Sequence, residues 1–282
     1  MDLSGKSEAE LRALVAALLE RGLHGLSFSP YIEGQEPGTH ISAEQIESRL
    51  AIIQPHVNWI RSFSCTEGHE QIPAIAKKAG LKTLVGAWLD EDREHNELEI
   101  ANVIEIGKAG DADIIAVGNE VLLRDELTED ELISYMQRVK DACPGVPVGY
   151  VDAYFKFETN PRVTEACDVV LANCYPFWEG CPIDHALLYM KEMYRRAQGM
   201  ANGKPVIISE TGWPNIGTAE EGAVPSFDNA IRYLLNTFKW AEEDDVPVFY
   251  FSSFDEAWKV AAEGDVGAYW GIWDSDGNPK YS

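Results

Sequence analysis

A regular alternation of short apolar runs and longer amphipathic stretches is the feature of this sequence that most constrains its fold. The apolar runs have the length and the β-branched content of strands. Eight of them occupy residues 24–31, 57–64, 82–89, 112–120, 146–153, 167–176, 204–210 and 246–254. Helical patterns fill most of the intervals, near 42–54, 68–79, 94–109, 128–142, 184–198 and 226–243. Strands that alternate with helices form parallel sheets, and eight such units close into a barrel. We therefore predict an α/β fold, a single (β/α)₈ TIM barrel.

Local signals mark the ends of several helices. A capping box, in which a hydroxyl residue and a Glu or Gln three positions later bind each other's backbone, identifies a helix start. The pattern occurs at Ser7 with Glu10, Ser42 with Gln45 and Thr128 with Glu131. The first of these predicts an extra N-terminal helix, which ends at Gly22, before the first strand. The segment near 158–166 is short and only weakly helical.

The length of the chain fits one barrel. It has 282 residues, and barrels of this type run to about 250 residues as a single unit. We expect one domain over residues 1–282. A doubly wound open sheet is the alternative, but no glycine-rich dinucleotide loop follows a predicted strand. The barrel is therefore the favoured fold.

The net charge of the chain limits the classes of molecule that it is expected to bind. Lys and Arg number 23 against 47 Asp and Glu, which gives a net charge of −24. Nucleic acids and anionic membranes are bound through basic patches, so an acidic surface disfavours both of them, as well as anionic polysaccharides. A neutral substrate fits better, although solubility alone also explains such a surface.

The cysteines and the hydropathy give weaker signals. Five cysteines, at 65, 143, 167, 174 and 181, form no zinc or redox spacing. Buried thiols are the default, and a bridge between Cys174 and Cys181 is the one alternative that their spacing allows. The sequence contains neither a signal-peptide pattern nor a long apolar span, so we expect no membrane insertion. The histidines form no metal set, and we expect neither a metal nor an organic cofactor.

Two predicted strands end directly in a glutamate. Active sites of TIM barrels lie at the carboxyl ends of the strands, where strands four and seven end in Glu120 and Glu210. These strands face each other across the barrel mouth. Two carboxylates that flank a bond are what glycoside hydrolysis needs, one protonated and one ionised. Either glutamate alone could be half of a structural ion pair, but the combination favours catalysis.

Aromatic residues gather at the same ends of the strands. Aromatic faces suit the flat apolar faces of sugar rings, and a sugar also fits the charge argument. Trp178 and Trp213 follow strands six and seven in polar loops, so we expect them to face a ligand. Trp88 and Phe177 serve equally well as packing at the barrel rim.

At this point the chain resembles glycoside hydrolase family 17, the β-1,3-glucanases and related glucanosyltransferases. The resemblance covers nearly the whole chain after the first helix and is specific in its pairing of "GNE" with "SETGWP". The matching segments are "FSPY", "IRSFSCTEG", "AVGNEV", "ANCYPFW", "VIISETGWP", "YFSSFDEAWK" and "YWGIWDSDGNPKY". The interval between strands six and seven is compact and lacks the added subdomain of plant members. The chain therefore looks like a compact bacterial or fungal-like form, in which the length of the cleft is open.

The resemblance implies a role for individual residues. Glu120 is similar to the general acid/base of the family and Glu210 to its nucleophile, and Arg61 or Tyr175 would keep Glu210 ionised. Asn119 would bind the 2-hydroxyl of the sugar. The remaining residues expected to border the cleft are Tyr31, Glu256 and Lys259.

The implied function is retaining hydrolysis of β-1,3-glucan of the laminarin type, expected to be endo-acting and carried out by a monomer. A polymeric neutral glucan substrate favours an extracellular or periplasmic location. Three rival functions remain: a transglycosylase on the same site, a glucan-binding module with an inactive site, and a barrel glycosidase acting on β-mannan or mixed-linkage glucan. The intact pair of Glu120 and Glu210 argues against the binding module.

Overall fold

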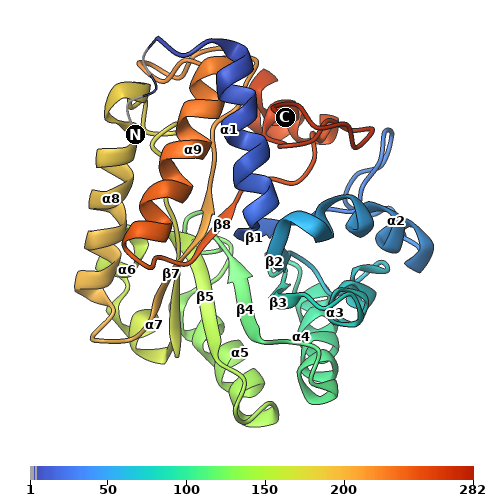
Figure 1. Cartoon of the computed structure of the whole chain (residues 1–282). Coiled ribbons are helices and arrows are strands. Elements are labelled where there is room, and N and C mark those ends of the chain that lie inside the picture. Colours follow the sequence, from blue (N-terminus) through green and yellow to red (C-terminus); the bar gives the residue numbers. More distant parts are fainter. Residues whose placement is uncertain (1–2, 4) are drawn as a thin grey trace.

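The computed structural model describes residue 3 and residues 5–282, and it confirms the predicted barrel (Figure 1). Eight parallel strands hydrogen-bond in sequence order and β8 closes on β1. The strands are β1 Leu23–Ser27, β2 Val57–Ser62, β3 Lys82–Ala87, β4 Ile114–Asn119, β5 Val148–Ala153, β6 Val169–Asn173, β7 Val206–Thr211 and β8 Val248–Tyr250. Each lies inside or within one residue of a predicted apolar run.

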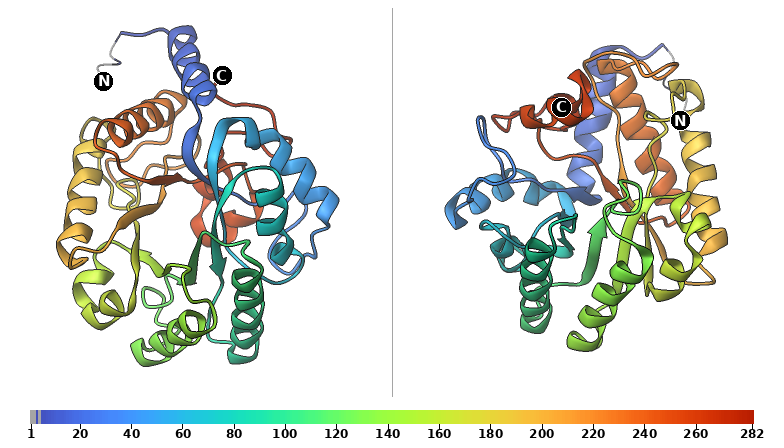
Figure 2. Two further views of the ribbon diagram at one scale, coloured as in Figure 1. Left: turned by 60° about the horizontal axis from the view of Figure 1, so that its bottom comes forward. Right: turned by 180° about the vertical axis from the view of Figure 1, so that it is seen from behind.

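Helices surround the strands (Figure 2, left). They are α1 Glu8–Arg21, α2 Ala43–Ile53, α3 Ile72–Lys78, α4 Arg93–Ala109, α5 Glu129–Ala142, α6 Lys156–Thr159, α7 Pro161–Ala166, α8 Ile183–Met200, α9 Phe227–Glu243 and α10 Val260–Glu263. Short 3₁₀ turns cover Gln54–His56, His69–Gln71, Ala257–Lys259 and Asp265–Tyr269. The weakly helical interval after β5 holds the two short helices α6 and α7.

The extra N-terminal helix is confirmed, and it covers a part of the barrel that no helix after β8 covers. The chain after β8 forms only the four-residue α10 and 3₁₀ turns, so β8 is not followed by a long covering helix. Helix α1 packs instead beside α9 (Figure 1), with the Arg12 guanidinium 4.6 Å from the Phe227 ring centre. It thereby covers the barrel next to β1 and β8.

The capping boxes are confirmed for two of the three predicted helices. Ser7 and Thr128 each exchange side-chain and backbone hydrogen bonds with the glutamate three residues later. Ser42 caps α2 in one direction only: its hydroxyl oxygen accepts from the Gln45 backbone N–H, but the Gln45 side chain does not accept from the Ser42 backbone N–H and instead donates from Nε2 to the Pro30 carbonyl oxygen.

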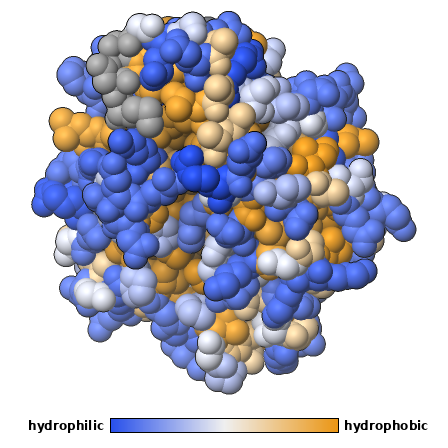
Figure 3. All heavy atoms as spheres, in the orientation of Figure 1, coloured by the Kyte–Doolittle hydropathy of each residue, from blue (hydrophilic) through white to orange (hydrophobic). Residues whose placement is uncertain are grey.

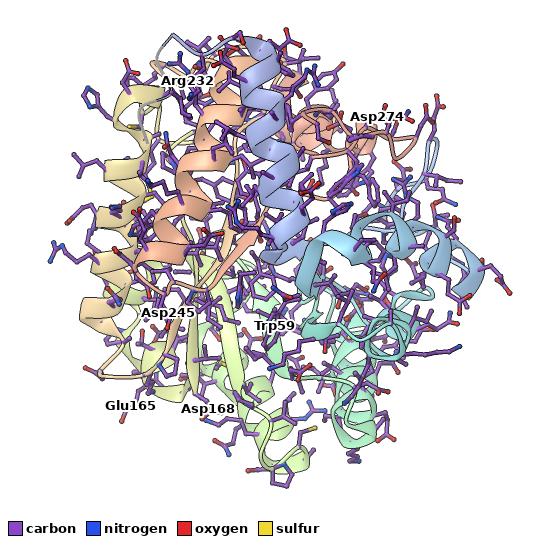
Figure 4. All side chains as sticks on the ribbon, in the orientation of Figure 1. Trp59, Glu165, Asp168, Arg232, Asp245 and Asp274 are labelled. Carbon is purple, nitrogen blue, oxygen red and sulfur yellow. The ribbon has the colours of Figure 1, made fainter. Side chains whose placement is uncertain are left out.

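The buried apolar residues form two clusters, one inside the barrel and one between the strands and the surrounding helices. The smaller cluster is made only of strand residues, which fill the barrel: Leu84, Ile114, Ala116, Val151, Val169, Leu171, Ile207 and Phe249. Trp59 packs against it near the amino ends of the strands, where its ring stacks on His24 at 5.9 Å (Figure 4). The larger cluster joins the outer face of the strands to the helices. Because the interior is filled, ligands can be accommodated only at the ends of the barrel.

The face drawn in Figure 3 is mostly hydrophilic with apolar patches between the polar areas, and the chain carries a net charge of −24. Exposed carboxylates include Glu165, Asp168 and Asp245, which lie at the amino ends of β6 and β8 (Figure 4). Within the described residues, no helix is long and apolar enough to cross a membrane.

Candidate active site

Glu120 lies immediately after β4, in a backbone conformation that turns its side chain toward the barrel mouth. The φ angles of Gly118 and Glu120 are 81° and 53°, in the left-handed region that L-residues rarely adopt. For a non-glycine residue such a conformation costs of order 1–2 kcal/mol. It is held in place because the Glu120 amide donates to the Val151 carbonyl oxygen on β5 at 2.8 Å.

Glu210 lies within β7 and is surrounded by hydrogen-bond donors. Arg61 on β2 donates from Nη1 to Oε1 at 2.5 Å, and the Tyr175 hydroxyl donates to Oε2 at 2.8 Å. Glu210 is 7% exposed and Arg61 is 1% exposed. A buried carboxylate is stable as the anion only when it is paired and hydrogen-bonded, and both conditions are met here. The structure therefore supplies both of the donors expected for Glu210.

Asn173, at the end of β6, contacts both glutamates. Its Nδ2 donates to Glu120 Oε1 at 2.8 Å and to Glu210 Oε1 at 3.3 Å. Two atoms that contact a common third atom cannot be farther apart than the two distances combined, so these oxygens are at most 6.1 Å apart. Ser209 fixes the orientation of the amide by donating to Asn173 Oδ1 at 2.8 Å.

The environments of the two carboxyl groups differ. The pKa of Glu120 is raised to about 7, first by burial, then by the negative charge of Glu210, and further by Asp152 on β5. Asn173 and Arg124 oppose this rise. Near neutral pH the site can therefore hold one protonated carboxyl group beside one anion, the arrangement that divides acid and base roles between two similar residues.

A concave site opens around the two glutamates at the barrel mouth. Its walls are largely aromatic, with further carboxylates at the sides. The lining residues are Glu120, Leu123, Ala153, Tyr154, Phe155, Asn173, Tyr175, Trp178, Glu179, Glu210, Phe251, Glu263 and Trp270. Trp178 is 39% exposed and is one of the lining residues, and its contact with a ligand stays a prediction. The pocket therefore brings together both candidate catalytic residues, Tyr175 and Trp178.

The prediction for Trp213 is wrong in this structure. Its ring is 1% exposed and packs on Phe177 and Tyr233 at centroid distances of 5.3 and 5.4 Å. Its indole N–H donates to the Val224 carbonyl oxygen at 3.1 Å, so the polar atom is also satisfied internally. Trp213 supports the pocket wall from behind instead of facing a ligand.

The other predicted residues lie beneath or beside the pocket. Asn119 is half-buried and accepts a hydrogen bond from Arg61 Nη2 at 2.6 Å, which links it to the ion pair of Arg61 with Glu210. Tyr31 packs edge-on against Trp258 and His69. Glu256 and Lys259 form a buried ion pair with each other, and the ammonium lies 4.0 Å from the centre of the Phe251 ring. These residues shape the surroundings of the pocket and are not among its lining residues.

Sequence reasoning did not assign several of the lining residues. Asn173 was visible as a strand end, but its link between the two glutamates depends on the register of β6 against β7. Glu263 ends the four-residue α10 and Trp270 follows the last 3₁₀ turn, and these elements are too short for periodicity to indicate which side chains turn inward. Their inclusion is a result of the tertiary structure alone.

The cysteines and potential metal ligands add no further site. All five cysteines are free, so the structure contains no bridge between Cys174 and Cys181. In the part of the chain that is described, His, Cys, Asp and Glu side chains form no group of three or more suited to a metal ion.

Comparison with known proteins identifies relatives of this chain. The BtgE/BtgC glycoside hydrolase domain matches residues 25–271. A protein of Arthroderma benhamiae named glucan 1,3-beta-glucosidase is 28% identical over 260 residues, 84% of this chain and 83% of the relative. A protein of the same name from Saccharomyces cerevisiae is 26% identical over 270 residues, 87% of this chain and 86% of the relative.

Solved structures of other enzymes superpose on this chain. The glycoside hydrolase family 17 β-1,3-glucanosyltransferase of Rhizomucor miehei superposes with a TM-score of 0.83 at 28% identity, covering 93% of this chain and 96% of that one. An active-site mutant of a β-1,3-glucanosyltransferase from the same organism, in complex with laminaritriose, gives 0.83 at 27% identity with the same coverage. A β-galacturonidase of Eisenbergiella tayi shares the fold alone, at a TM-score of 0.72 and 19% identity.

Proposed function

The chain belongs to the BtgE/BtgC glycoside hydrolase domain family, and from that membership we propose that it is a retaining glycosidase acting on β-1,3-glucan. In this proposal Glu210 is the nucleophile and Glu120 is the acid/base. The observation that supports it is the shared contact with Asn173, which holds Glu120 Oε1 and Glu210 Oε1 at most 6.1 Å apart, a range that includes the separation of a retaining pair. Retaining enzymes hold their carboxyl groups about 5–5.5 Å apart, whereas inverting enzymes need about 6.5–9.5 Å.

The first half-reaction assigns one task to each glutamate. Glu210 attacks C1 of the sugar, and a bond from its carboxylate oxygen to C1 forms as the glycosidic C–O bond breaks. Glu120 delivers its proton to the departing oxygen, so the leaving chain departs as a neutral alcohol. Arg61 and Tyr175 keep Glu210 ionised and oriented before the attack.

The second half-reaction needs Glu120 as a base. In the free enzyme the charge of Glu210 raises the pKa of Glu120. Once Glu210 is esterified this charge is gone, so the pKa of Glu120 falls. The ionised Glu120 then takes a proton from the incoming water, whose oxygen attacks C1 and releases Glu210. The same pair of residues thus serves both steps without an additional group.

The substrate class follows from the relatives and from the pocket. Relatives that align over most of their length are named glucan 1,3-beta-glucosidase, and a structural relative was solved with laminaritriose. The aromatic wall suits the faces of sugar rings, and the net charge of −24 suits a neutral glucan. We place the activity outside the cytoplasm, where such polymers occur, and expect an endo-acting monomer.

Transglycosylation is the second candidate, because the two structures that superpose with a TM-score of 0.83 at 27% and 28% identity are those of β-1,3-glucanosyltransferases. Both reactions pass through the same glycosyl-enzyme and differ only in whether water or a sugar hydroxyl attacks it. The geometry of the two glutamates is equally suited to both.

Incubation with laminarin and defined laminari-oligosaccharides, with the products sized, tests the proposal. Shorter products of several lengths indicate endo-hydrolysis, glucose alone indicates exo-action, and products longer than the substrate indicate transfer. Retention of the β-anomer in the first product is measured by NMR. The Glu210→Ala variant should release no product while still binding the glucan. Turnover of β-mannan or mixed-linkage glucan in preference to laminarin would contradict the proposed substrate.

A further inference from the structure

The strand that carries Glu120 is distorted just before that residue. Strands β4 and β5 are neighbours in the barrel (Figure 1), and in their pairing Ala116 lies opposite Gly149 whereas Asn119 lies opposite Val151. Three steps along β4 therefore match two steps along β5, which makes a β-bulge. Bulges change the direction of nearby side chains and are common next to active sites. The position of the Glu120 carboxyl group thus depends on a backbone conformation that regular strand pairing does not supply.

The turn that follows the proposed acid/base is held by side chains of β5 and of the first residue of α6. The Leu122 N–H donates to the Tyr150 hydroxyl at 3.0 Å, and the Leu122 carbonyl oxygen accepts from Lys156 Nζ at 2.9 Å. The Leu123 N–H donates to the Asp152 carboxylate. Three side chains of one short segment thus bind the backbone of two consecutive residues. We call Tyr150, Asp152 and Lys156 the turn clamp.

Two members of the turn clamp also bind each other. The Tyr150 hydroxyl donates to Asp152 Oδ2, and the Ala153 N–H donates to Asp152 Oδ1 at 2.7 Å. Tyr150 is 1% exposed and Asp152 is 0% exposed. Burial raises the pKa of Asp152 to about 6, and this rise is opposed first by the hydrogen bonds from Tyr150 and Ala153. Neither member of the pair is among the lining residues of the pocket, so both lie behind it.

We propose that the turn clamp positions Glu120 for proton transfer to and from the reacting oxygen atoms. Its members are positioning residues, because they act through Glu120 and not on the substrate. Asn173 holds the carboxyl group itself, with Nδ2 2.8 Å from Glu120 Oε1, whereas the turn clamp holds the backbone that carries it. The inference rests on the proposed function, because it deepens the role of Glu120 as the acid/base.

This positioning should matter most in the steps that move a proton. A general acid or base acts when its oxygen lies within about 2.6–3.2 Å of the atom that gives or takes the proton. A displacement of about 1 Å can cost about 100-fold in rate. The attack of Glu210 on C1 depends on β7 and needs no proton from Glu120. Loss of the turn clamp should therefore slow the reactions that need Glu120 and spare those that do not.

The test removes the contacts of the turn clamp one at a time. Tyr150→Phe keeps the buried ring and removes the hydroxyl that binds Leu122 and Asp152. Lys156→Met keeps most of the side-chain length and removes the donor to the Leu122 carbonyl oxygen. Thermal melts establish that each variant is folded. If Tyr150→Phe does not fold, Lys156→Met carries the test.

Two control variants remove the same chemical groups at the opposite end of the barrel. Tyr194→Phe removes a hydroxyl that donates to the Val206 carbonyl oxygen at 3.4 Å. Lys204→Met removes an ammonium group that donates to the Thr164 carbonyl oxygen at 2.8 Å. Val206 begins β7 and Lys204 precedes it, so both contacts lie at the amino end of that strand, away from the site. Both controls should keep the wild-type rates.

The substrates differ in whether the leaving group needs a proton. On laminari-oligosaccharides, which need it, kcat/KM should fall about 10- to 100-fold in Tyr150→Phe and in Lys156→Met. On dinitrophenyl β-laminaribioside, whose leaving group departs without a proton, the burst of dinitrophenol should keep the wild-type rate. Azide should restore the steady-state rate after the burst, because this anion attacks C1 of the glycosyl-enzyme without a general base.

A double variant tests whether the turn clamp acts through Glu120. In the Glu120→Gln background, added Tyr150→Phe or Lys156→Met should slow oligosaccharide cleavage little further, because the group that is positioned is already gone. Losses of residues that act through one group do not multiply. A purely structural role would give the same loss in both backgrounds.

Three outcomes would overturn the inference and leave the function intact. The first is wild-type cleavage of oligosaccharides by both folded variants. The second is a dinitrophenol burst slowed as much as oligosaccharide cleavage, which would mean that the turn clamp supports the whole site. The third is a loss that multiplies with that of Glu120→Gln. If the wild type turns over neither laminarin nor dinitrophenyl β-laminaribioside, the proposed function itself is wrong, and this inference is rejected with it.

Discussion

Arg61 and Glu210 form an ion pair in which both side chains are buried, with exposed fractions of 2% and 9%. Nη1 of Arg61 lies 2.5 Å from Oε1 of Glu210. The pair joins β2 to β7 and so connects opposite parts of the barrel. Arg61 also donates to the Ser209 carbonyl oxygen and to Asn119. The guanidinium therefore fixes the position of the proposed nucleophile as well as its charge.

Arg61→Met should impair both stability and turnover. Removing one partner of a buried ion pair leaves an uncompensated charge and costs about 3–5 kcal/mol. Arg21→Met is the matched control, because Arg21 pairs with Glu242 at the surface, with exposures of 57% and 51%. An exposed pair contributes about 0–1 kcal/mol. Denaturant unfolding of both variants measures the difference, and equal losses would contradict the role of Arg61.

Glu120→Gln should slow the cleavage of laminari-oligosaccharides by roughly 10²–10⁴-fold, the usual contribution of a general acid. A dinitrophenyl glycoside leaves without protonation, so formation of its glycosyl-enzyme should be much less affected. Burst kinetics with both kinds of substrate separate the steps. Equal losses on the two substrates would count against Glu120 as the acid.

The dependence of kcat/KM on pH should show a basic limb near pH 7. Glu120 must be protonated in the free enzyme, so activity falls as the pH rises through its pKa of about 7. Asp152→Asn removes a negative charge that raises this pKa, so the limb should move to lower pH. Asp245→Asn, at the far end of the barrel (Figure 4), is the control and should leave the limb in place. An unmoved limb in Asp152→Asn would exclude this electrostatic link.

The ionised Glu120 carboxyl group should also lower the free energy of unfolding at high pH. Its pKa is about 7 in the folded chain against 4.5 as the ordinary value, so folding disfavours the anion. The stability associated with the protonated form is complete below pH 4.5 and is lost as the pH rises through 7, by about 3 kcal/mol. Glu120→Gln should therefore melt at a higher temperature than the wild type at pH 8 and at a similar temperature at pH 4. A constant difference across this range would show that the carboxyl group is not perturbed.

Trp178→Ala and Trp213→Ala should have different effects. Trp178 is exposed at the rim, so its loss should raise KM for oligosaccharides with little change in melting temperature. Trp213 is buried behind the wall, and truncation of a buried tryptophan costs about 3–5 kcal/mol. Melting curves and KM values of both variants test this assignment. A purely binding defect in Trp213→Ala would restore the original prediction for that residue.

The architecture could be predicted because it depends on local patterns. Apolar runs such as Val206–Thr211 repeat with strand length between amphipathic helices, and each run carries its own periodicity. Glu120 and Glu210 were also predictable, because strand ends in a barrel converge at one mouth regardless of the detailed packing. Arg61 and Tyr175 were identified through the chemical need of Glu210 for donors.

The sequence by itself thus determined the barrel, the two facing glutamates and the acidic character of the surface. Only the tertiary structure decided that Trp178 faces the cleft while Trp213 is buried, although both follow strands in polar loops. It also decided that Asn173 joins the two glutamates and that Glu263 and Trp270 turn into the pocket. The physical reason is that periodicity specifies which face of one element is apolar. Contacts between residues far apart in the chain depend on barrel closure, strand register and loop packing, which no local pattern encodes.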